Sequence, residues 1–174
     1  DVFGDTQGCV INFIRPQAIA MLADIINEMC DVFQSSPFFH MGSDESNFAL
    51  FETWPDVVAN RKATGRNTPQ QHCWLINEIN KVVKKRGKQL IVWEGFYLPE
   101  VDKDVLVMEW DGRYFDPPGV AAAGYKMINV PWVPSIGATA GENYDWNQWL
   151  IGSQDRTPDQ FKRGTPEGNL IIGG

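Results

Sequence analysis

Three short and almost continuously apolar segments constrain the fold of this chain more than any other feature. They are residues 89–95 (QLIVWEG), 105–110 (VLVMEW) and 125–132 (YKMINVPW), and each has a tryptophan at or near its end. Strands that are apolar at nearly every position are typical of a parallel sheet covered on both faces. Parallel strands also need crossover connections, which helices between them supply. The sequence therefore predicts an α/β fold with a parallel sheet.

Apolar periodicity predicts the helices. From Pro16 to Gln34 apolar residues recur every three or four positions, which predicts a helix with one apolar face. A similar pattern begins at an expected N-cap, Thr68, and ends at residues 84–87 (KKRG), where basic residues and a glycine suit a helix C-terminus. Residues 117–123 predict a short third helix.

The sequence also predicts two further strands and a long connection. Residues 38–42 (FFHMG) form a short aromatic and apolar run, which predicts a buried strand. Residues 169–172 predict a last strand. Residues 46–67 mix Asn, Thr, Pro and Gly without clear periodicity, and their length predicts a functional loop rather than a simple connection.

The composition excludes several classes of protein. The chain has 174 residues, 43% of them apolar, and a formal net charge of −7, which predicts a single globular domain over residues 1–174. Nucleic-acid binders carry a basic surface, and disordered chains lack the 10 Phe and 7 Trp found here. No segment approaches the ~20 apolar residues that a membrane span requires. Neither nucleic acid nor a membrane span is expected.

Few residues of the chain have the spacing that a metal or cofactor site requires. Cys9, Cys30 and Cys73 fit no metal-ligand spacing, and His40 and His72 are the two histidines of the chain. Three buried thiols are favoured over a disulfide. Because no phosphate-binding motif is present either, no metal and no cofactor are expected.

Carboxylates and indoles gather where the predicted strands end. In parallel α/β folds ligands bind at the carboxyl ends of the strands, and such side chains suit a sugar, whose C–H faces stack on rings while its hydroxyls need acceptors. One tryptophan at a strand end equally well fills space beneath a loop, but three beside a carboxylate pair favour a sugar site. The residues are Asp44, Glu45, Trp93, Glu94, Trp110, Asp111 and Trp132.

Residues 38–45, FFHMGSDE, resemble the H-x-G-G-D-E signature of the family 20 glycoside hydrolases, the β-N-acetylhexosaminidases, with Ser43 in place of the second glycine. Segments downstream agree with the family in order and spacing, namely VWEG at 92–95, MEW at 108–110, NVPWVP at 129–134 and YDWN at 144–147. The resemblance implies a (β/α)8 TIM barrel. Because eight βα units usually need ~200 residues or more, it implies a partial barrel here, about strands four to eight, in an incomplete catalytic domain.

The resemblance also implies an activity. Family members hydrolyse terminal non-reducing β-linked N-acetylglucosamine or N-acetylgalactosamine from glycans with retention, and the nucleophile is the carbonyl oxygen of the substrate's own acetamide, which forms an oxazolinium ion. Carried over by position, Glu45 is the general acid/base and Asp44 orients the acetamide. Without the preceding HMGS, a helix N-cap or turn role would be favoured for this pair. His40 is expected to support the site rather than to donate a proton.

The remaining site residues follow from the same resemblance. Trp93 would form a wall of the acetamide pocket, with Trp110 and Trp132 as further walls or as core residues. For Glu94 and Asp111, hydrogen bonds to sugar hydroxyls and ordinary surface salt bridges are equally expected.

One departure from the family pattern leaves a second function open. Ile136 stands where related sequences carry the tyrosine that bonds the acetamide carbonyl. Tyr144 and Trp146, on a loop long enough to reach the site, are expected to contact the substrate, and Tyr144 is the candidate to supply the missing hydroxyl. The alternative is a catalytically silent carbohydrate-binding domain on the same fold.

The partners implied are an oligosaccharide or glycoconjugate substrate and the remaining barrel segments of the parent chain. A half-barrel exposes unpaired strand edges, which isolated chains tolerate poorly. Family habit and the acidic composition suggest a periplasmic or extracellular location.

Overall fold

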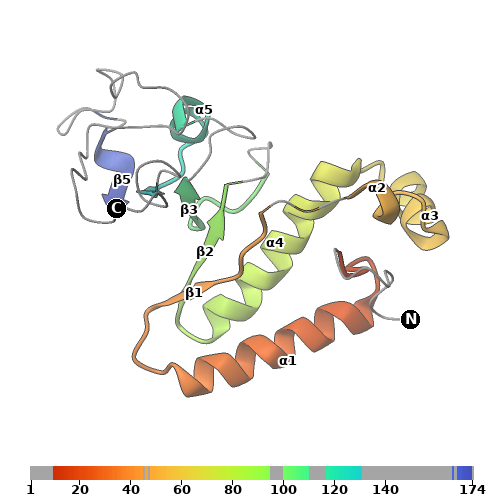
Figure 1. Ribbon diagram of the computed structural model, residues 1–174, viewed down its shortest axis with the longest axis horizontal. Helices are drawn as coiled ribbons and strands as arrows, with labels where there is room; N and C mark the ends of the chain where they lie inside the picture. Colours follow the sequence, from red (N-terminus) through yellow and green to blue (C-terminus); the bar gives the residue numbers. More distant parts are fainter. Residues whose placement is uncertain are drawn as a thin grey trace, which may run out of the picture. The chain divides into compact units, whose positions relative to one another are not determined.

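The computed structural model of this chain contains both helices and strands, and the helices α2, α3 and α4 follow one another between β1 and β2 (Figure 1). Five strands form one sheet in the order β1-β2-β3-β4-β5, so each strand lies next to the one that precedes it in the chain. The structure describes residues 10–44, 46, 48–94, 100–109, 117–130, 166 and 168–173.

The chain divides into two compact units. Helices α1 to α4 belong to the first unit, whereas β3, β4 and β5 belong to the second. The boundaries between the units fall within β1 and β2. The first unit is Asp1–Phe39, Glu45–Leu90 and Leu98–Asp102, and the second is His40–Asp44, Ile91–Tyr97 and Lys103–Gly174.

The sheet is parallel, as predicted. Parallel pairing joins β2 to β3, β3 to β4 and β4 to β5, with Ile91 opposite Leu106 and Val107 opposite Met127. Successive residues of β3 are buried, so this strand is covered on both faces and its unbroken apolar sequence is explained. The strands are β1 (Phe38–His40), β2 (Gln89–Trp93), β3 (Leu106–Glu109), β4 (Met127–Asn129) and β5 (Ile171–Gly173).

The second unit also contains two short helical segments. The predicted helix at 117–123 is confirmed as α5 (Pro117–Ala122), and it ends before Gly124, whose φ of 83° suits a glycine. A 3-10 turn, Gly168–Leu170, leads into β5. The core of this unit consists of Val92, Val105, Leu106, Val107, Val120, Tyr125 and Met127.

The first unit contains two long helices. The predicted helix from Pro16 is confirmed as α1 (Pro16–Val32), and it packs against α4 (Thr68–Lys85), as Figure 1 shows. The N-cap of α4 is Asn67 rather than Thr68. The Asn67 side chain accepts from the Gln70 N–H at 2.9 Å, and the Gln70 side chain accepts from the Asn67 N–H at 3.0 Å. This reciprocal capping box fixes the start of α4 one residue earlier than predicted.

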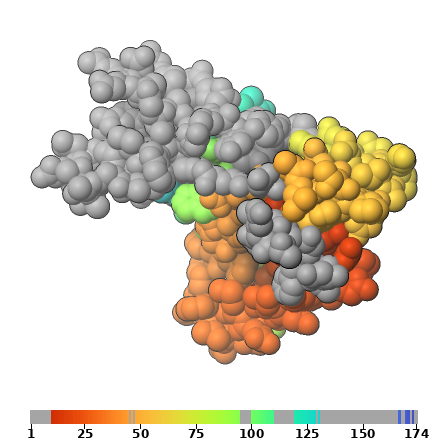
Figure 2. Space-filling model, turned by 45° about the vertical axis from the view of Figure 1, so that its right-hand side comes forward, coloured from red at the N-terminus to blue at the C-terminus, as the bar shows by residue number. Residues whose placement is uncertain are grey.

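The predicted apolar face of α1 is only partly covered. Ala18, Ile26 and Cys30 are buried, but Val32 is 75% exposed and Phe33, just after the helix, is 58% exposed. The orange atoms of α1 and of the turn into β1 lie open at the surface in Figure 2. Within the described residues, the apolar stripe of α1 is therefore wider than the surface that packs on it.

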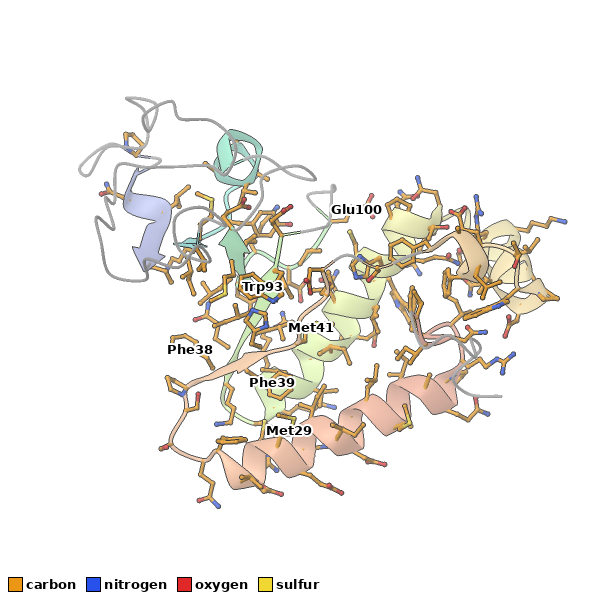
Figure 3. All side chains as sticks on the ribbon, viewed as in Figure 1. Met29, Phe38, Phe39, Met41, Trp93 and Glu100 are labelled. Atoms are coloured by element: carbon orange, nitrogen blue, oxygen red, sulfur yellow. The ribbon has the colours of Figure 1, made fainter. Side chains whose placement is uncertain are left out.

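Strand β1 is not buried, so that prediction is wrong. Phe38 and His40 are exposed and Phe39 is half-buried. Phe38 and Phe39 leave the strand on opposite sides, as Figure 3 shows. The physical reason is that β1 lies at one end of the strand order, so among the described strands its neighbour is β2. An apolar sequence does not bury a strand unless other elements cover it.

The long connection at 46–67 is not a plain loop, which corrects a second prediction. It contains α2 (Phe48–Phe51) and α3 (Pro55–Thr64). Pro55 occupies the first turn of α3, and Gly65, with a φ of 72°, ends it in the left-handed conformation. These signals were present, but α3 buries only Val57 and so lacks the apolar stripe that identifies a helix.

The described residues also show the state of two cysteines and bear on the predictions about membrane spans and metal sites. Cys30 and Cys73 are buried thiols, as predicted, whereas Cys9 lies outside the described residues. No helix in the described part of the chain is long and apolar enough to cross a membrane. Among the same residues, no group of three His, Cys, Asp or Glu side chains is placed to hold a metal ion.

Candidate active site

A tight turn follows the carboxyl end of β1 and carries the first of the predicted catalytic residues. Gly42 and Ser43 have φ angles of 77° and 85°, so two consecutive residues adopt the left-handed conformation. Only glycine adopts this conformation without cost. The geometry therefore explains why the second glycine of the H-x-G-G-D-E signature suits this position, and it makes Ser43 a strained substitute.

The carboxylate of Asp44 lies back over this turn. A Cβ atom added to Gly42 would meet Asp44 Oδ1 at 3.8 Å, so the carboxylate lies beside the Gly42 α-carbon. The Asp44 side chain is half-buried. Asp44 is thus a partly exposed carboxylate held at the carboxyl edge of the sheet.

Backbone hydrogen bonds tie this turn to the neighbouring strand. The Met41 N–H donates to the Ile91 carbonyl at 3.1 Å, and the Trp93 N–H donates to the Gly42 carbonyl at 2.9 Å. Figure 3 shows Met41 and Trp93 on the neighbouring ends of β1 and β2. The ladder therefore extends beyond β1 and places Asp44 and Trp93 at the same edge of the sheet.

His40 contacts both parts of this edge. Its Nδ1 accepts a hydrogen bond from the Gly42 N–H at 3.0 Å, and its ring meets the ring of Trp93 edge-on, with centroids 4.9 Å apart and an interplanar angle of 60°. Desolvation of the ring, which packs against Trp93, lowers the pKa of His40 below its ordinary value of 6.5, and the nearby Asp44 carboxylate acts against this shift. The imidazole is therefore neutral at neutral pH.

Two buried glutamates follow the next strand ends. Glu94, directly after β2, is 0% exposed. Glu109, the last residue of β3, is 3% exposed. The Glu94 N–H donates to the Met108 carbonyl, and the Glu109 carbonyl accepts from the Val130 N–H, so both residues belong to the ladder of the sheet.

Glu109 was not among the predicted site residues. The sequence signal for Glu109 is a carboxylate at the carboxyl end of an otherwise apolar strand. Glu94, directly after β2, has a similar place. The residue after Glu109, Trp110, was selected as a site residue instead.

Of the predicted site residues, the structure places His40, Asp44, Trp93 and Glu94 together at one edge of the sheet. The others lie outside the described residues, as does Ile136. They are Glu45, Trp110, Asp111, Trp132, Tyr144 and Trp146.

Comparison with known proteins identifies the family of this chain. A family model described as "Glycosyl hydrolase family 20, catalytic domain" matches residues 2–134, which is more than half of the chain. The chain belongs to glycosyl hydrolase family 20. The H-x-G-S-D-E segment at 40–45 lies within the matched region, so the turn described above is part of the family 20 catalytic domain.

Curated relatives of this family 20 chain are much longer than it is. It is 25% identical over 160 residues to a lacto-N-biosidase of Bifidobacterium bifidum, covering 83% of this chain and 14% of that protein. It is 23% identical over 184 residues to the β-hexosaminidase subunit beta of Rattus norvegicus, covering 95% of this chain and 33% of that protein.

Solved structures of family 20 proteins share the fold. The chain is similar to dispersin B with a TM-score of 0.67 and 15% identity, covering 98% of this chain and 54% of that one. It is similar to a β-N-acetylhexosaminidase of Bacteroides fragilis with a TM-score of 0.65 and 17% identity, covering 94% and 35%. The chain therefore shares its fold with these two proteins.

Proposed function

We propose that this chain carries the catalytic centre of a β-N-acetylhexosaminidase. It would hydrolyse terminal non-reducing β-linked N-acetylglucosamine or N-acetylgalactosamine by the retaining, substrate-assisted route. The observation that carries the proposal is the position of Asp44, which is held over a left-handed turn at the same sheet edge as Trp93 in a family 20 chain.

The two adjacent carboxylates take different tasks in this proposal. Asp44 accepts the acetamide N–H, which aims the acetamide oxygen at the anomeric carbon and offsets the positive charge that develops on the oxazolinium ion. Glu45 protonates the departing glycosidic oxygen. It then acts as a base and activates the water that attacks the anomeric carbon and opens the oxazolinium ring.

Trp93 suits a wall of the acetamide pocket. Trp93 is half-buried, so part of its surface is accessible to a ligand. An indole face excludes water from one side of the acetamide and contacts its methyl group without competing for its polar atoms. Glu94, buried directly after Trp93, is proposed to act on the sugar hydroxyls.

The test is hydrolysis of p-nitrophenyl β-N-acetylglucosaminide by the protein at its natural length. Glu45→Gln and Asp44→Asn should each lower kcat/KM by about 100-fold or more. Glu28→Gln, which changes an exposed carboxylate on α1, is the matched control and should leave it unchanged. Because one relative is named a lacto-N-biosidase, p-nitrophenyl lacto-N-bioside and the galacto-configured monosaccharide belong in the same panel.

Substrate assistance has its own test. Replacing the acetamide of the substrate by a trifluoroacetamide weakens its carbonyl oxygen as a nucleophile, so kcat should fall steeply. An enzyme that uses a protein carboxylate as nucleophile would show little dependence on this group. Equal rates on both substrates would therefore overturn the proposed mechanism while leaving a glycosidase.

The alternative, a catalytically silent carbohydrate-binding domain, makes the opposite prediction about affinity. A thiazoline mimic of the oxazolinium ion should bind an enzyme far more tightly than N-acetylglucosamine does. Equal affinity for the two, together with no turnover of any substrate in the panel, would favour the silent domain and point to Ile136 as its cause.

We further propose that the sheet is part of a (β/α)8 barrel, about strands four to eight. Exposed β1 at one end of the strand order supports this, because an apolar edge strand is normally covered or paired. The remaining barrel segments would then pair with β1 and cover the exposed stripe of α1. A periplasmic or extracellular location remains part of the proposal and is tested by fractionating cells that produce the protein.

A further inference from the structure

His40 joins the two elements of the proposed site that touch the substrate's acetamide. Through Nδ1 it holds the Gly42 N–H, at the start of the turn that carries Asp44. Through its ring it meets Trp93 on β2 at a centroid distance of 4.9 Å. All of these contacts lie within the second compact unit.

The hydrogen bond determines the state of the imidazole. An acceptor nitrogen must present a lone pair, so Nδ1 carries no proton and the single proton of the neutral ring lies on Nε2. A doubly protonated ring has no acceptor nitrogen, and its formation breaks the bond to the Gly42 N–H. The turn is therefore held by the neutral ring and released by the cation.

The turn needs such a restraint. Gly42 and Ser43 both have positive φ values, and Ser43 adopts this conformation against the preference of an L-residue. The Asp44 carboxylate lies beside Gly42, two residues away in the same turn, so a shift of Gly42 displaces the carboxylate. A misplacement of about 1 Å in a positioned catalytic group can cost on the order of 100-fold in rate.

We propose that His40 is a positioning residue of this site, whose neutral imidazole aligns Asp44 through the Gly42 N–H and fixes the plane of Trp93 by ring contact. This inference rests on the proposed function, since it concerns the two groups assigned there to the acetamide. His40 itself is not assigned a proton transfer or a contact with the sugar.

The charges near His40 agree with this role. Among the described residues, Asp44 is a charged group that acts on the ring, and the contact from β2 is made by the uncharged Trp93. Desolvation of the ring outweighs the effect of the Asp44 charge, so the pKa of His40 lies below 6.5 and the ring stays neutral until the pH falls below that value. Acidification should then protonate His40 and release the turn.

Three substitutions separate the two contacts. His40→Phe keeps an aromatic ring against Trp93 but removes the acceptor. His40→Asn places an amide oxygen where Nδ1 lies and removes the ring. His40→Gln carries the same amide one bond farther out, and it is therefore the matched control for His40→Asn.

In the protein at its natural length, His40→Phe and His40→Gln should lower kcat on p-nitrophenyl β-N-acetylglucosaminide by about 10- to 100-fold, with KM within about threefold. His40→Asn should recover part of this loss relative to His40→Gln. The acidic fall of kcat that His40 protonation causes in the wild type should be absent in His40→Asn, since an amide does not titrate. Wild-type kcat in His40→Phe, or equal rates for the Asn and Gln variants, would overturn the proposal.

A measurement without turnover keeps this inference separate from the proposed function. Long-range nitrogen–proton NMR correlations of the His40 ring, assigned with the His40→Asn variant, should show Nε2 protonated and Nδ1 bare at pH 7. A proton on Nδ1 would refute the positioning role even in an active enzyme. If the wild type instead lacks all hydrolysis and Glu45→Gln changes nothing, the proposed function fails, and with it the role of His40 in aligning a catalytic Asp44.

Discussion

The buried histidine of the first unit should make the stability of this protein depend on pH. His72 lies on α4 and is 4% exposed, with the Phe48 ring 5.3 Å and the Phe13 ring 6.5 Å from its own, centroid to centroid. Burial lowers the pKa of His72 from 6.5 to about 4. The folded state thus keeps this imidazole neutral over a range in which the unfolded state binds a proton.

The sign and size of the effect follow from that difference. Below pH 6.5 the unfolded chain gains a proton at His72 that the folded chain refuses, so the free energy of unfolding falls as the pH falls toward 4. Each unit of difference corresponds to about 1.4 kcal/mol, so the stability lost through His72 between pH 7 and pH 4.5 is about 2.5 kcal/mol. Above pH 6.5 the contribution is complete and no longer changes.

Urea unfolding of the wild type and of His72→Gln, compared at the same pH between 7.5 and 4.5, tests this reasoning. The variant should lose stability at pH 7 but show a flatter dependence on pH, so that the two free energies converge on acidification. Ile76→Val, a buried substitution on the same helix, is the control and should cost about 1 kcal/mol at every pH. Parallel curves for the wild type and His72→Gln would refute the assignment of this pH dependence to His72.

Three further substitutions test other contacts by their effect on the free energy of unfolding in urea. Ser43→Gly should raise it by about 0.5 kcal/mol, because relief of the strained φ of 85° exceeds the extra chain entropy of glycine; a decrease would show that Ser43 is not strained. Lys88→Met should lower the free energy of unfolding by about 2 kcal/mol. The buried Lys88 ammonium donates to the Phe33 carbonyl at 2.8 Å and so stabilises the turn after α1. An unchanged free energy of unfolding would show that this hydrogen bond does not stabilise the turn. Asp56→Ala should lower the free energy of unfolding by about 1–2 kcal/mol, because the buried Asn12 amide loses acceptors at 2.9 and 3.1 Å, and Asn12→Ala combined with it should then add little.

Local sequence signals predicted the elements of this fold because those signals act over a few residues. The three- and four-residue spacing of apolar side chains located α1 and α4, and unbroken apolar runs located β2 and β3. Where the local signal was weak, as in α3 with its single buried residue, the helix was missed. Helix caps were predicted to within one residue, since Asn67 and Thr68 are both suitable N-caps and the choice depends on Gln70.

The site was predicted in part for the same reason. Asp44 and Trp93 lie at one edge of the sheet because the carboxyl ends of parallel strands meet there, and the prediction used this rule. The strained conformation of Ser43 and the bond from Gly42 to His40 could not be read from the motif, because a backbone angle and a side-chain rotamer depend on what surrounds them.

The sequence by itself determined which segments are helices and strands, the parallel nature of the sheet and the membership of family 20. Only the tertiary structure decided which of these elements are covered. Phe38 is exposed although its segment is as apolar as β2, whereas Glu94 and Glu109 are buried although carboxylates usually face water. The physical reason is that hydropathy is a property of a residue, whereas burial is a property of its neighbours, and those neighbours come from distant parts of the chain.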